Sequence, residues 1–338
     1  MKQPSASALD QAVVVDLTAV IVSVTDDQPR VLVRPHPGQP RSAGGRRRGR
    51  DAGAFEALPS GPLQLRHRTL EAGLRAWVEE QTGAFLGYVE QLYTFGDRDR
   101  TVGHGGGAHR VLSIGYLALT RASGNKVSDD TVWRDWYRYF PWEDRRHGGT
   151  AMSPRLERAL RRWIAAGRAG AERTARDERA SLAFGLDGTA WSDERVLERY
   201  ELLYQIGIVA EATRDGRAGT ADGPPVDGQP MAADHRRILA TAIARLRGKI
   251  KYRPVVFELM APTFTFLQLQ RAVETLAGVR LHKQNFRRLV TQQGLVEETG
   301  GIVTSTGGRP AREMRYRQEA ILERPALGVR LPAARGIG

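Results

Sequence analysis

The C-terminal quarter of the chain constrains the fold most, because its elements follow one another in a distinctive order. Amphipathic helical patterns at 234–250, 266–278 and 281–294 precede a segment that alternates and turns like a β-hairpin with a glycine-rich tip. Three helices and a hairpin within about 80 residues are the order expected of a winged helix-turn-helix. We therefore predict a winged helix DNA-binding domain in residues 231–317 and an irregular tail in residues 318–338.

Positive charge is concentrated in this region. The formal net charge of the chain is +13, and residues 249–317 carry twelve basic and five acidic side chains, a net charge of +7. Such an excess favours a polyanionic partner, nucleic acid before membrane. An arginine-rich genome, which would raise the basic content everywhere, is the alternative explanation. Lys249, Lys251 and Arg253 are candidate phosphate ligands, although a helix C-terminus favours cations by its dipole alone.

The charge of the third helix, 281–294, is confined to one side. At 100° per residue Phe286, Leu289 and Val290 share an apolar face, and the opposite side and flanks carry side chains suited to base edges and phosphates. A surface helix with solvated charges is the alternative. We predict DNA-binding residues on this helix and at the hairpin tip: Lys283, Gln284, Asn285, Arg287, Arg288, Thr291, Arg309 and Arg312.

The N-terminal part of the chain alternates strands, one helix and further strands, as α/β domains do. Two β-branched apolar runs in residues 11–34, joined by TDDQP, predict paired strands, and YVEQLYTF and VLSIGYLALT predict two more. The glycine-rich stretches at 35–54 and 96–110 predict irregular loops.

Between these two regions the sequence predicts a helical insert. Two helical patterns dominate residues 153–213, and GRAGTADGPPVDGQP at 216–230 is typical of a linker. The insert either supplies dimer contacts or forms an intramolecular helical pair. The predicted division is a disordered N-terminus at 1–10, an α/β domain at 11–150, an insert and linker at 151–230, and the winged helix at 231–317.

Several functional classes are excluded by the composition. No window approaches the ~18 consecutive apolar residues of a membrane span, and the N-terminus lacks the apolar core of a signal peptide. The chain has no cysteine, so neither disulfides nor thiolate metal sites hold the fold. We expect a cytoplasmic protein that does not bind membranes.

The helix ending at Gly83 carries a partial motif. ALPSGP followed by TLEAGLRAWVEEQTG resembles the Nudix box, G-x5-E-x7-R-E-U-x-E-E-x-G-U, where U is a bulky apolar residue. Anchored on Gly83, the box places its first helical glutamate on Trp77 and its later glutamate pair on Glu80 and Gln81. Anchored instead on Arg75, it places the first glutamate on Ala76 and the pair on Glu79 and Glu80.

Both registers lose the first acid of the box. Magnesium needs several oxygen ligands in a near-octahedral array, which stacked carboxylates on a helix supply. One or two glutamates leave the metal weakly held and a pyrophosphate unactivated. Trp77 is in phase with Leu70, Leu74 and Val78, so we place it in the core. We predict no hydrolytic activity, no catalytic residues and no metal site.

A Nudix-like domain joined to a winged helix resembles the Nudix-related transcriptional regulators of NAD metabolism. KYRPVVFELMAPTFTFLQLQRAVETLAGVRLHKQNFRRLV and GGRPAREMRYR are similar to their DNA-binding module. HRTLEAGLRAWVEEQTG, GYVEQLYTFGDRDR, SIGYLALTR and WYRYFPWED are similar to the longer branch, which has a helical insert. The resemblance covers residues 11–317. It implies an α/β (α+β) Nudix-like sandwich domain, a helical insert and a C-terminal winged helix-turn-helix.

The resemblance also implies a function. A homodimeric repressor of NAD-biosynthesis genes would bind a palindromic double-stranded DNA operator. NAD, ADP-ribose or ATP would act as the effector, and no further cofactor would be required. A dinucleotide needs cations for its phosphates and an aromatic ring for adenine, although Tyr93 and Phe95 suit the core equally well. The candidate ligand-binding residues are Arg66, His67, Arg68, Glu80, Tyr93, Phe95, Asp97, Arg98 and Arg100.

Two other functions are consistent with these patterns. An active Nudix pyrophosphatase acting on ADP-ribose or a dinucleotide would have a basic tail that binds nucleic acid incidentally. A DNA-binding protein with a purely structural Nudix fold would not respond to nucleotides.

Overall fold

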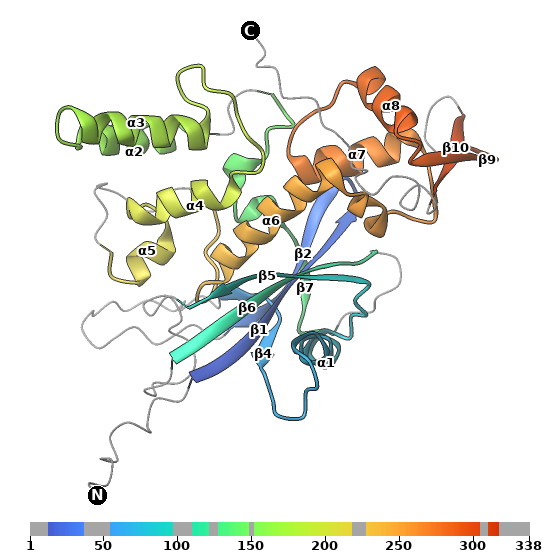
Figure 1. Ribbon diagram of the computed structural model, residues 1–338, viewed down its shortest axis with the longest axis horizontal. Coiled ribbons are helices and arrows are strands. Elements are labelled where there is room, and N and C mark those ends of the chain that lie inside the picture. The colour runs from blue at the N-terminus through green and yellow to red at the C-terminus, as the bar shows by residue number, and fades with distance from the viewer. Residues whose placement is uncertain are drawn as a thin grey trace, which may run out of the picture.

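A seven-stranded mixed sheet occupies the centre of the N-terminal part of the computed structural model (Figure 1). The structure describes residues 13–36, 55–96, 110–121, 128–148, 152–217, 228–304 and 310–317. The predicted N-terminal segment 1–10, most of the two glycine-rich loops, the centre of the 216–230 linker and the tail from 318 lie outside them. The strand order is β3-β2-β1-β6-β5, with β4 paired to β1 and β7 to β2. The strands are β1 (Val13–Thr25), β2 (Gln28–His36), β3 (Phe55–Ala57), β4 (Ser60–Pro62), β5 (Tyr88–Phe95), β6 (Arg110–Leu119) and β7 (Val132–Asp135).

The predicted strand pair at the start of the chain is confirmed as the β1–β2 hairpin. Its turn residues Asp26 and Asp27 have φ of 53° and 56°, so both adopt the left-handed conformation that a tight hairpin turn requires and that aspartate tolerates. β1 also pairs in parallel with β6, from Val13 opposite Arg110 to Val22 opposite Leu119. This long central strand therefore joins the two halves of the sheet.

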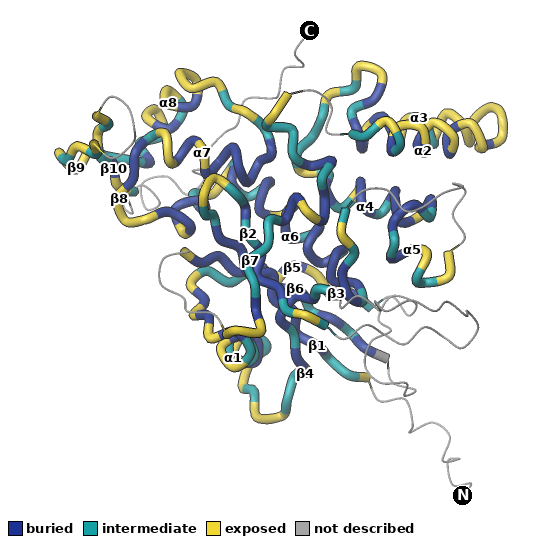
Figure 2. Tube along the Cα trace, turned by 180° about the vertical axis from the view of Figure 1, so that it is seen from behind, coloured by how far each residue is buried: buried dark blue, intermediate teal, exposed yellow. Residues whose placement is uncertain are grey.

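Helices cover both faces of the sheet. On one face α1 (Leu70–Thr82) buries Leu74 and Val78 against a cluster that includes Leu17 and Ile21 of β1. The Thr69 side chain caps the start of α1, and Gly83, with φ 67°, ends it. The opposite face packs against α6 (His235–Tyr252) (Figures 1 and 2). These two layers complete the predicted α/β sandwich.

The insert contains more helices than its sequence predicted. Each predicted helical pattern is interrupted by glycine: Gly167 and Gly170 separate α2 from α3, and Gly207, with φ 76°, separates α4 from α5. The α2–α3 hairpin extends away from the sheet (Figure 1), whereas the apolar face of α4 is buried in the core cluster that includes α6. The elements are η2 (Trp136–Arg138), η3 (Pro141–Glu143), α2 (Pro154–Ala165), α3 (Ala171–Phe184), α4 (Val196–Gln205) and α5 (Ala210–Arg214).

The C-terminal region forms the predicted winged helix. The side chain of Thr265 and that of Gln268 cap the start of α7 reciprocally, and Gly278, with φ 73°, ends it. The predicted hairpin is β9–β10, and β8 adds a third strand that the sequence did not indicate, in the order β8-β10-β9. The elements are η4 (Val255–Leu259), β8 (Thr263–Phe264), α7 (Phe266–Ala277), α8 (Lys283–Gln292), β9 (Val296–Val303) and β10 (Ala311–Tyr316). No helix among the described residues is long and apolar enough to cross a membrane.

A buried ion cluster joins these parts. Glu143 of η3 binds Arg199 of α4 at 2.5 Å and Arg247 of α6 at 2.6 Å, and all three side chains are fully buried. Other guanidinium N–H groups of both arginines have backbone acceptors. Arg247 donates to the carbonyl of Leu276 at 2.9 Å, and Arg199 donates to that of Ala183 at 2.9 Å. The segments η3, α3, α4 and α6 and the end of α7 therefore meet around Glu143 and its two arginines.

The charge state of Glu143 follows from this geometry. Burial alone would raise the pKa of its carboxyl, but the two guanidinium groups outweigh burial and hold the pKa below its ordinary value of 4.5. Because both arginines are buried, removing the carboxylate would leave two uncompensated cations in the core.

We predict that Glu143→Gln lowers the free energy of unfolding by ~3–5 kcal/mol, the usual effect of breaking a buried ion pair. Urea denaturation measures the change. The matched control is Glu157→Gln, because Glu157 is 48% exposed and lies 3.9 Å from Arg161; its effect should stay below ~1 kcal/mol. The difference between wild type and Glu143→Gln should shrink as the pH falls through the lowered pKa of Glu143, since the stabilisation requires the ionised carboxylate. Equal effects of the two substitutions would contradict the prediction.

Candidate nucleic-acid interface and nucleotide site

Helix α8 presents its polar side to solvent, as its sequence predicted. Phe286 and Val290 are buried and Leu289 is half-buried. The opposite side carries Lys283, Gln284, Asn285, Arg287, Arg288 and Thr291, all exposed. The predicted amphipathic orientation is therefore confirmed, and these side chains are available to a partner.

The cations of α8 differ from the other cations of the basic region in their pairing. Within the described part of the chain, Lys283, Arg287 and Arg288 form no ion pair with a carboxylate. The guanidinium of Arg287 lies 5.0 Å from the centre of the Phe266 ring, which orients it without neutralising it. Among the described residues of the basic region, the cations of α8 thus lie on the helix whose side chains the sequence predicts to contact base edges and phosphates.

Two other candidate phosphate ligands have internal partners. Lys249 binds Glu90 of β5 at 2.5 Å, and Lys251 binds Asp193 and Glu194 at 2.6 Å each. These lysines attach the end of α6 to the sheet and to the insert. The sequence could not show this, because the carboxylates lie far away along the chain.

The wing carries acids beside its arginines. Arg312 of β10 binds Glu298 of β9 at 2.6 Å, and Arg315 binds Glu297 at 2.6 Å. Arg312 remains 73% exposed, so it can reach a partner, but its charge is already offset. The predicted tip residue Arg309 lies outside the described residues.

Glu274, which the sequence analysis did not single out, fixes the turn between α7 and α8. Its Oε1 accepts the backbone N–H of Leu281 at 2.8 Å and the side-chain amide of Gln270 at 2.9 Å. The same amide donates to the carbonyl of Leu281 at 3.0 Å. Glu274 is 4% exposed, so a buried carboxylate holds the start of α8 against α7.

On the other side of the molecule, α1 settles the register of the Nudix box. Val78 is buried and Gly83 ends the helix in the left-handed conformation, as the apolar position and the glycine of the box require. The register anchored on Gly83 therefore applies. It places Gln81 at an acidic position, where its amide donates to the carbonyl of Ser60 at 2.7 Å and accepts from the N–H of Ser60 at 3.3 Å. Gln81 attaches α1 to β4.

Trp77 does not lie where its phase predicted. It is half-buried, and its ring covers Gly61 of β4 instead of joining the cluster around Leu74 and Val78. Its indole Nε1 donates to the carbonyl of Pro62 at 2.8 Å. Because α1 lies across the edge where β4 pairs with β1, this side chain meets the edge strand and not the centre of the sheet.

The candidate ligand-binding residues form two separate groups. Arg66 and Arg68 are exposed in the loop before α1, and Glu80 is exposed in its last turn. His67 is half-buried, and its Nδ1 accepts the N–H of Gln64 at 3.2 Å. This group lies with α1 on one face of the sheet.

The aromatic candidates lie with α6 on the opposite face. Phe95 is 2% exposed and packs over Gly115 beside Ile238, so it belongs to the core. Tyr93 is 63% exposed, and its ring centre lies 5.5 Å from that of Phe95. Asp97, Arg98 and Arg100 lie outside the described residues. Over the described ranges, the structure contains no group of three or more metal-ligating side chains.

Part of the chain matches a known domain. Residues 256–316 match the family model of the NrtR DNA-binding winged helix domain. The chain is also 40% identical over 86 residues to the ADPR responsive transcriptional repressor NtrR of Acinetobacter baylyi. That match covers 25% of this chain and 34% of the relative, so it spans about a third of the relative's length.

Solved structures share the whole architecture. Shewanella oneidensis NrtR complexed with a 27mer DNA gives a TM-score of 0.51 at 20% identity and covers 90% of this chain and 94% of its own. A MutT/nudix family protein from Enterococcus faecalis gives a TM-score of 0.51 at 18% identity, covering 94% and 90%. The fold predicted from the sequence, a Nudix-like domain with a C-terminal winged helix, is confirmed, as is the resemblance to Nudix-related regulators.

We predict that Gly61→Ala destabilises the protein by ~1–3 kcal/mol through overpacking, because an added Cβ would overlap the Trp77 ring. Substituting Trp77→Leu in the same chain should relieve the overlap, so the double variant should lose less stability than the sum of the single losses. Gly87→Ala is the control, since its nearest neighbour would be the Leu119 carbonyl at 3.6 Å. Additive losses in urea denaturation would show that Trp77 does not cover Gly61.

Proposed function

We propose that the chain is a DNA-binding transcriptional repressor of NAD-biosynthesis genes, regulated by a nucleotide that binds its Nudix-like domain. The observation that carries the proposal is α8, whose exposed cations form no ion pair with a carboxylate of the described residues and lie within a region that matches the NrtR winged helix. The solvent-facing side chains of α8 are of two kinds, those suited to base edges and those suited to phosphates.

Arginine pairs bidentately with guanine, and glutamine or asparagine with adenine, so Arg288, Gln284 and Asn285 are the proposed base readers. Lys283 and Arg287 are the proposed phosphate contacts, which position the helix without reading sequence. Thr291 and the wing residues Arg309 and Arg312 complete the proposed interface. The Shewanella oneidensis protein, which has a similar fold, was solved in complex with a 27mer DNA, and this supports DNA as the proposed partner.

We propose ADP-ribose as the effector, because the Acinetobacter baylyi relative is named as responsive to ADPR; NAD and ATP are the other candidates. Arg66 and Arg68 precede the N-terminus of α1, where the helix dipole and free N–H groups favour phosphate. We assign the pyrophosphate to this end of α1. His67 and Glu80, which also lie with α1, complete the proposed set on this face, and Asp97, Arg98 and Arg100 remain candidates outside the described residues. Tyr93 and Phe95 are withdrawn from the set, because they lie on the opposite face of the sheet and Phe95 is buried in the core.

We propose that the Nudix-like domain binds a nucleotide without hydrolysing its pyrophosphate. In the register that the structure supports, Trp77 and Gln81 replace two glutamates of the box, and both are engaged with β4. Glu80 alone supplies too few oxygen ligands for a magnesium ion that activates a pyrophosphate. We further propose a cytoplasmic homodimer on a palindromic operator, because a two-fold protein matches a two-fold site.

In gel shifts with promoter fragments of NAD-biosynthesis genes, the protein should bind more tightly than it binds unrelated DNA of equal length. Arg288→Ala should weaken specific binding by ~1–3 kcal/mol if the side chain pairs with a base. Arg312→Ala should have a smaller effect, because Glu298 already offsets that charge. Affinity should fall steeply with salt. Equal binding to specific and unrelated DNA would refute the proposed function.

Incubation with ADP-ribose or NAD and magnesium should give no turnover at ordinary enzyme rates of ~1 per second or more. Phosphate release or chromatography of the products measures it. Trp77→Phe, which keeps an aromatic ring and adds no acid, serves as a control for the preparation and should be equally inactive. Turnover by the wild-type protein would support the pyrophosphatase function instead.

A further inference from the structure

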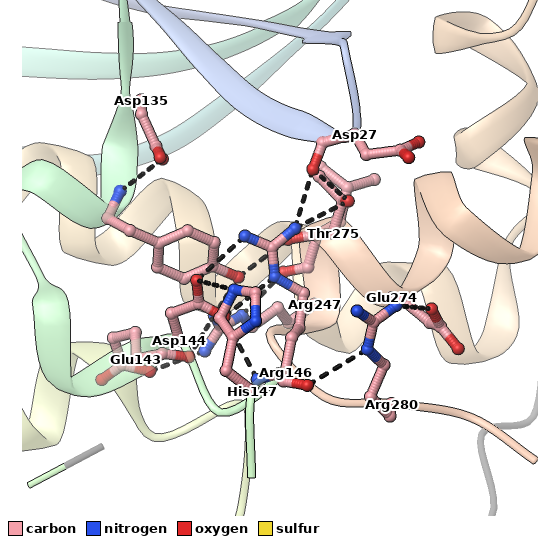
Figure 3. A network of polar contacts seen from close by, with 12 residues as sticks. Asp27, Asp135, Glu143, Asp144, Arg146, His147, Arg247, Glu274, Thr275 and Arg280 are labelled. Carbon is pink, nitrogen blue, oxygen red and sulfur yellow. Dashed lines mark hydrogen bonds and ion pairs between the residues drawn. The ribbon is translucent and has the colours of Figure 1, made fainter.

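The turn of the β1–β2 hairpin touches the winged helix through Arg146 (Figure 3). The guanidinium of Arg146 binds the Asp144 carboxylate through Nε at 2.8 Å and Nη2 at 2.9 Å. Its Nη1 donates to the carbonyl of Asp27 at 2.8 Å and to Oγ1 of Thr275 at 3.0 Å. One side chain therefore contacts both the sheet and α7.

Thr275 closes a triangle with these groups. Its hydroxyl donates to the same Asp27 carbonyl at 2.8 Å while it accepts from Arg146. Arg271, one turn earlier on α7, binds the Asp27 carboxylate at 3.1 Å. We call the contacts among Asp27, Arg146, Arg271 and Thr275 the turn joint. Three of its four bonds link the hairpin turn or Arg146 to α7, and the fourth links Arg146 to the turn, so a displacement of the turn must move α7 or break bonds of the joint.

The same segment continues to α8. The carbonyl of Arg146 accepts from Arg280 Nε at 3.1 Å, and the Arg280 guanidinium binds Glu274 at 3.1 Å. Glu274 in turn holds the N–H of Leu281, two residues before α8. The backbone N–H of Arg145 also donates to the carbonyl of Gly278 at 2.8 Å. The joint thus contacts the groups that orient α8 on α7.

The other end of the joint leads to α1. Asp27 follows directly on β1, and β1 packs Leu17 and Ile21 against α1. A strand that is buried on both faces and paired on both sides moves as a rigid element. A ligand that shifts α1 against the sheet would therefore displace the turn at the far end of β1.

The joint is better suited to switching than the Glu143 cluster. Glu143, Arg199 and Arg247 are fully buried, so their ion pairs cannot open without exposing charge to the core. In the joint, Arg271 and Asp27 are each about half exposed, whereas Arg146 is 10% exposed and Thr275 is buried. Water can therefore replace the Arg271–Asp27 ion pair when it opens, while the bonds of Arg146 and Thr275 set the position of the turn on α7. The Glu143 cluster fixes α6 to the insert, and the joint contains an ion pair that can open without exposing a charge to the core.

We infer that the turn joint transmits the nucleotide state of the Nudix-like domain to α8, with Arg146 and Thr275 as positioning residues. This inference rests on the proposed function. It requires that nucleotide binding changes the affinity for DNA, typically by 5- to 150-fold. This coupling passes through Arg146 and Thr275 and not through the buried Glu143 cluster.

The test compares DNA affinity with and without saturating ADP-ribose, followed by NAD and ATP, using fluorescence anisotropy on full-length protein. Thr275→Val removes the hydroxyl and keeps the side-chain shape, and Arg146→Gln removes the charge. Both variants should still bind DNA and, by calorimetry, the nucleotide. The ratio of the two DNA affinities should fall toward one in both. Thr275→Ser, which restores the hydroxyl, should keep the wild-type ratio.

Arg161→Gln is the matched control, because Arg161 forms an equally close ion pair with Asp187 at 2.6 Å on the α2–α3 hairpin, away from the joint; its ratio should equal that of the wild type. If Thr275→Val leaves the ratio of DNA affinities unchanged, this inference is overturned and the proposed function is not. A wild-type ratio of one with all three nucleotides would overturn the proposed nucleotide control, and the inference with it. Should Arg146→Gln fail to fold, the Thr275 pair decides the outcome.

Discussion

The Glu143 carboxylate is the group on which the arrangement of the domains depends. It forms ion pairs with Arg199 and Arg247, which come from different helices and are separated from it by 56 and 104 residues. Neither arginine could stay buried without it, because an unpaired guanidinium in the core costs several kcal/mol. The packing of the insert, α6 and the end of α7 therefore depends on the Glu143 carboxylate of η3. The sheet and the winged helix consequently share one continuous core.

A shared core connects the proposed nucleotide sensor physically to the proposed DNA reader. The polar contacts divide into the fully buried Glu143 cluster, which fixes the helices, and the turn joint, whose Arg271–Asp27 ion pair is open to water. Glu274 adds a local fixed point between α7 and α8. The orientation of α8 thus depends on few polar groups, and each has defined partners.

Sequence patterns predicted the elements whose signal is local. The faces of α8, the capped start of α7, the hairpin at TDDQP and the glycine that ends α1 all depend on neighbours within a few residues. The roles of Glu143, Lys249 and Glu274 were not predictable, because each depends on a partner brought close only by the tertiary fold. The core position predicted for Trp77 from its phase was wrong, because its neighbour is the edge strand β4, which periodicity does not locate. The two possible Nudix registers were separable only once Val78 and Gly83 had known conformations.

The bond between Gln81 and β4 has an evolutionary consequence. A neutral amide satisfies both the N–H and the carbonyl of Ser60, with one donor and one acceptor. A glutamate at this position would have only acceptors and would set a carboxylate oxygen against the Ser60 carbonyl. A glutamate at position 81 would therefore weaken the attachment of α1 to β4, and a glutamate at position 77 would remove the Trp77 ring from Gly61. Each of the two acids that the Nudix box would place here would lower stability in this fold, so single substitutions toward a metal-binding helix are disfavoured.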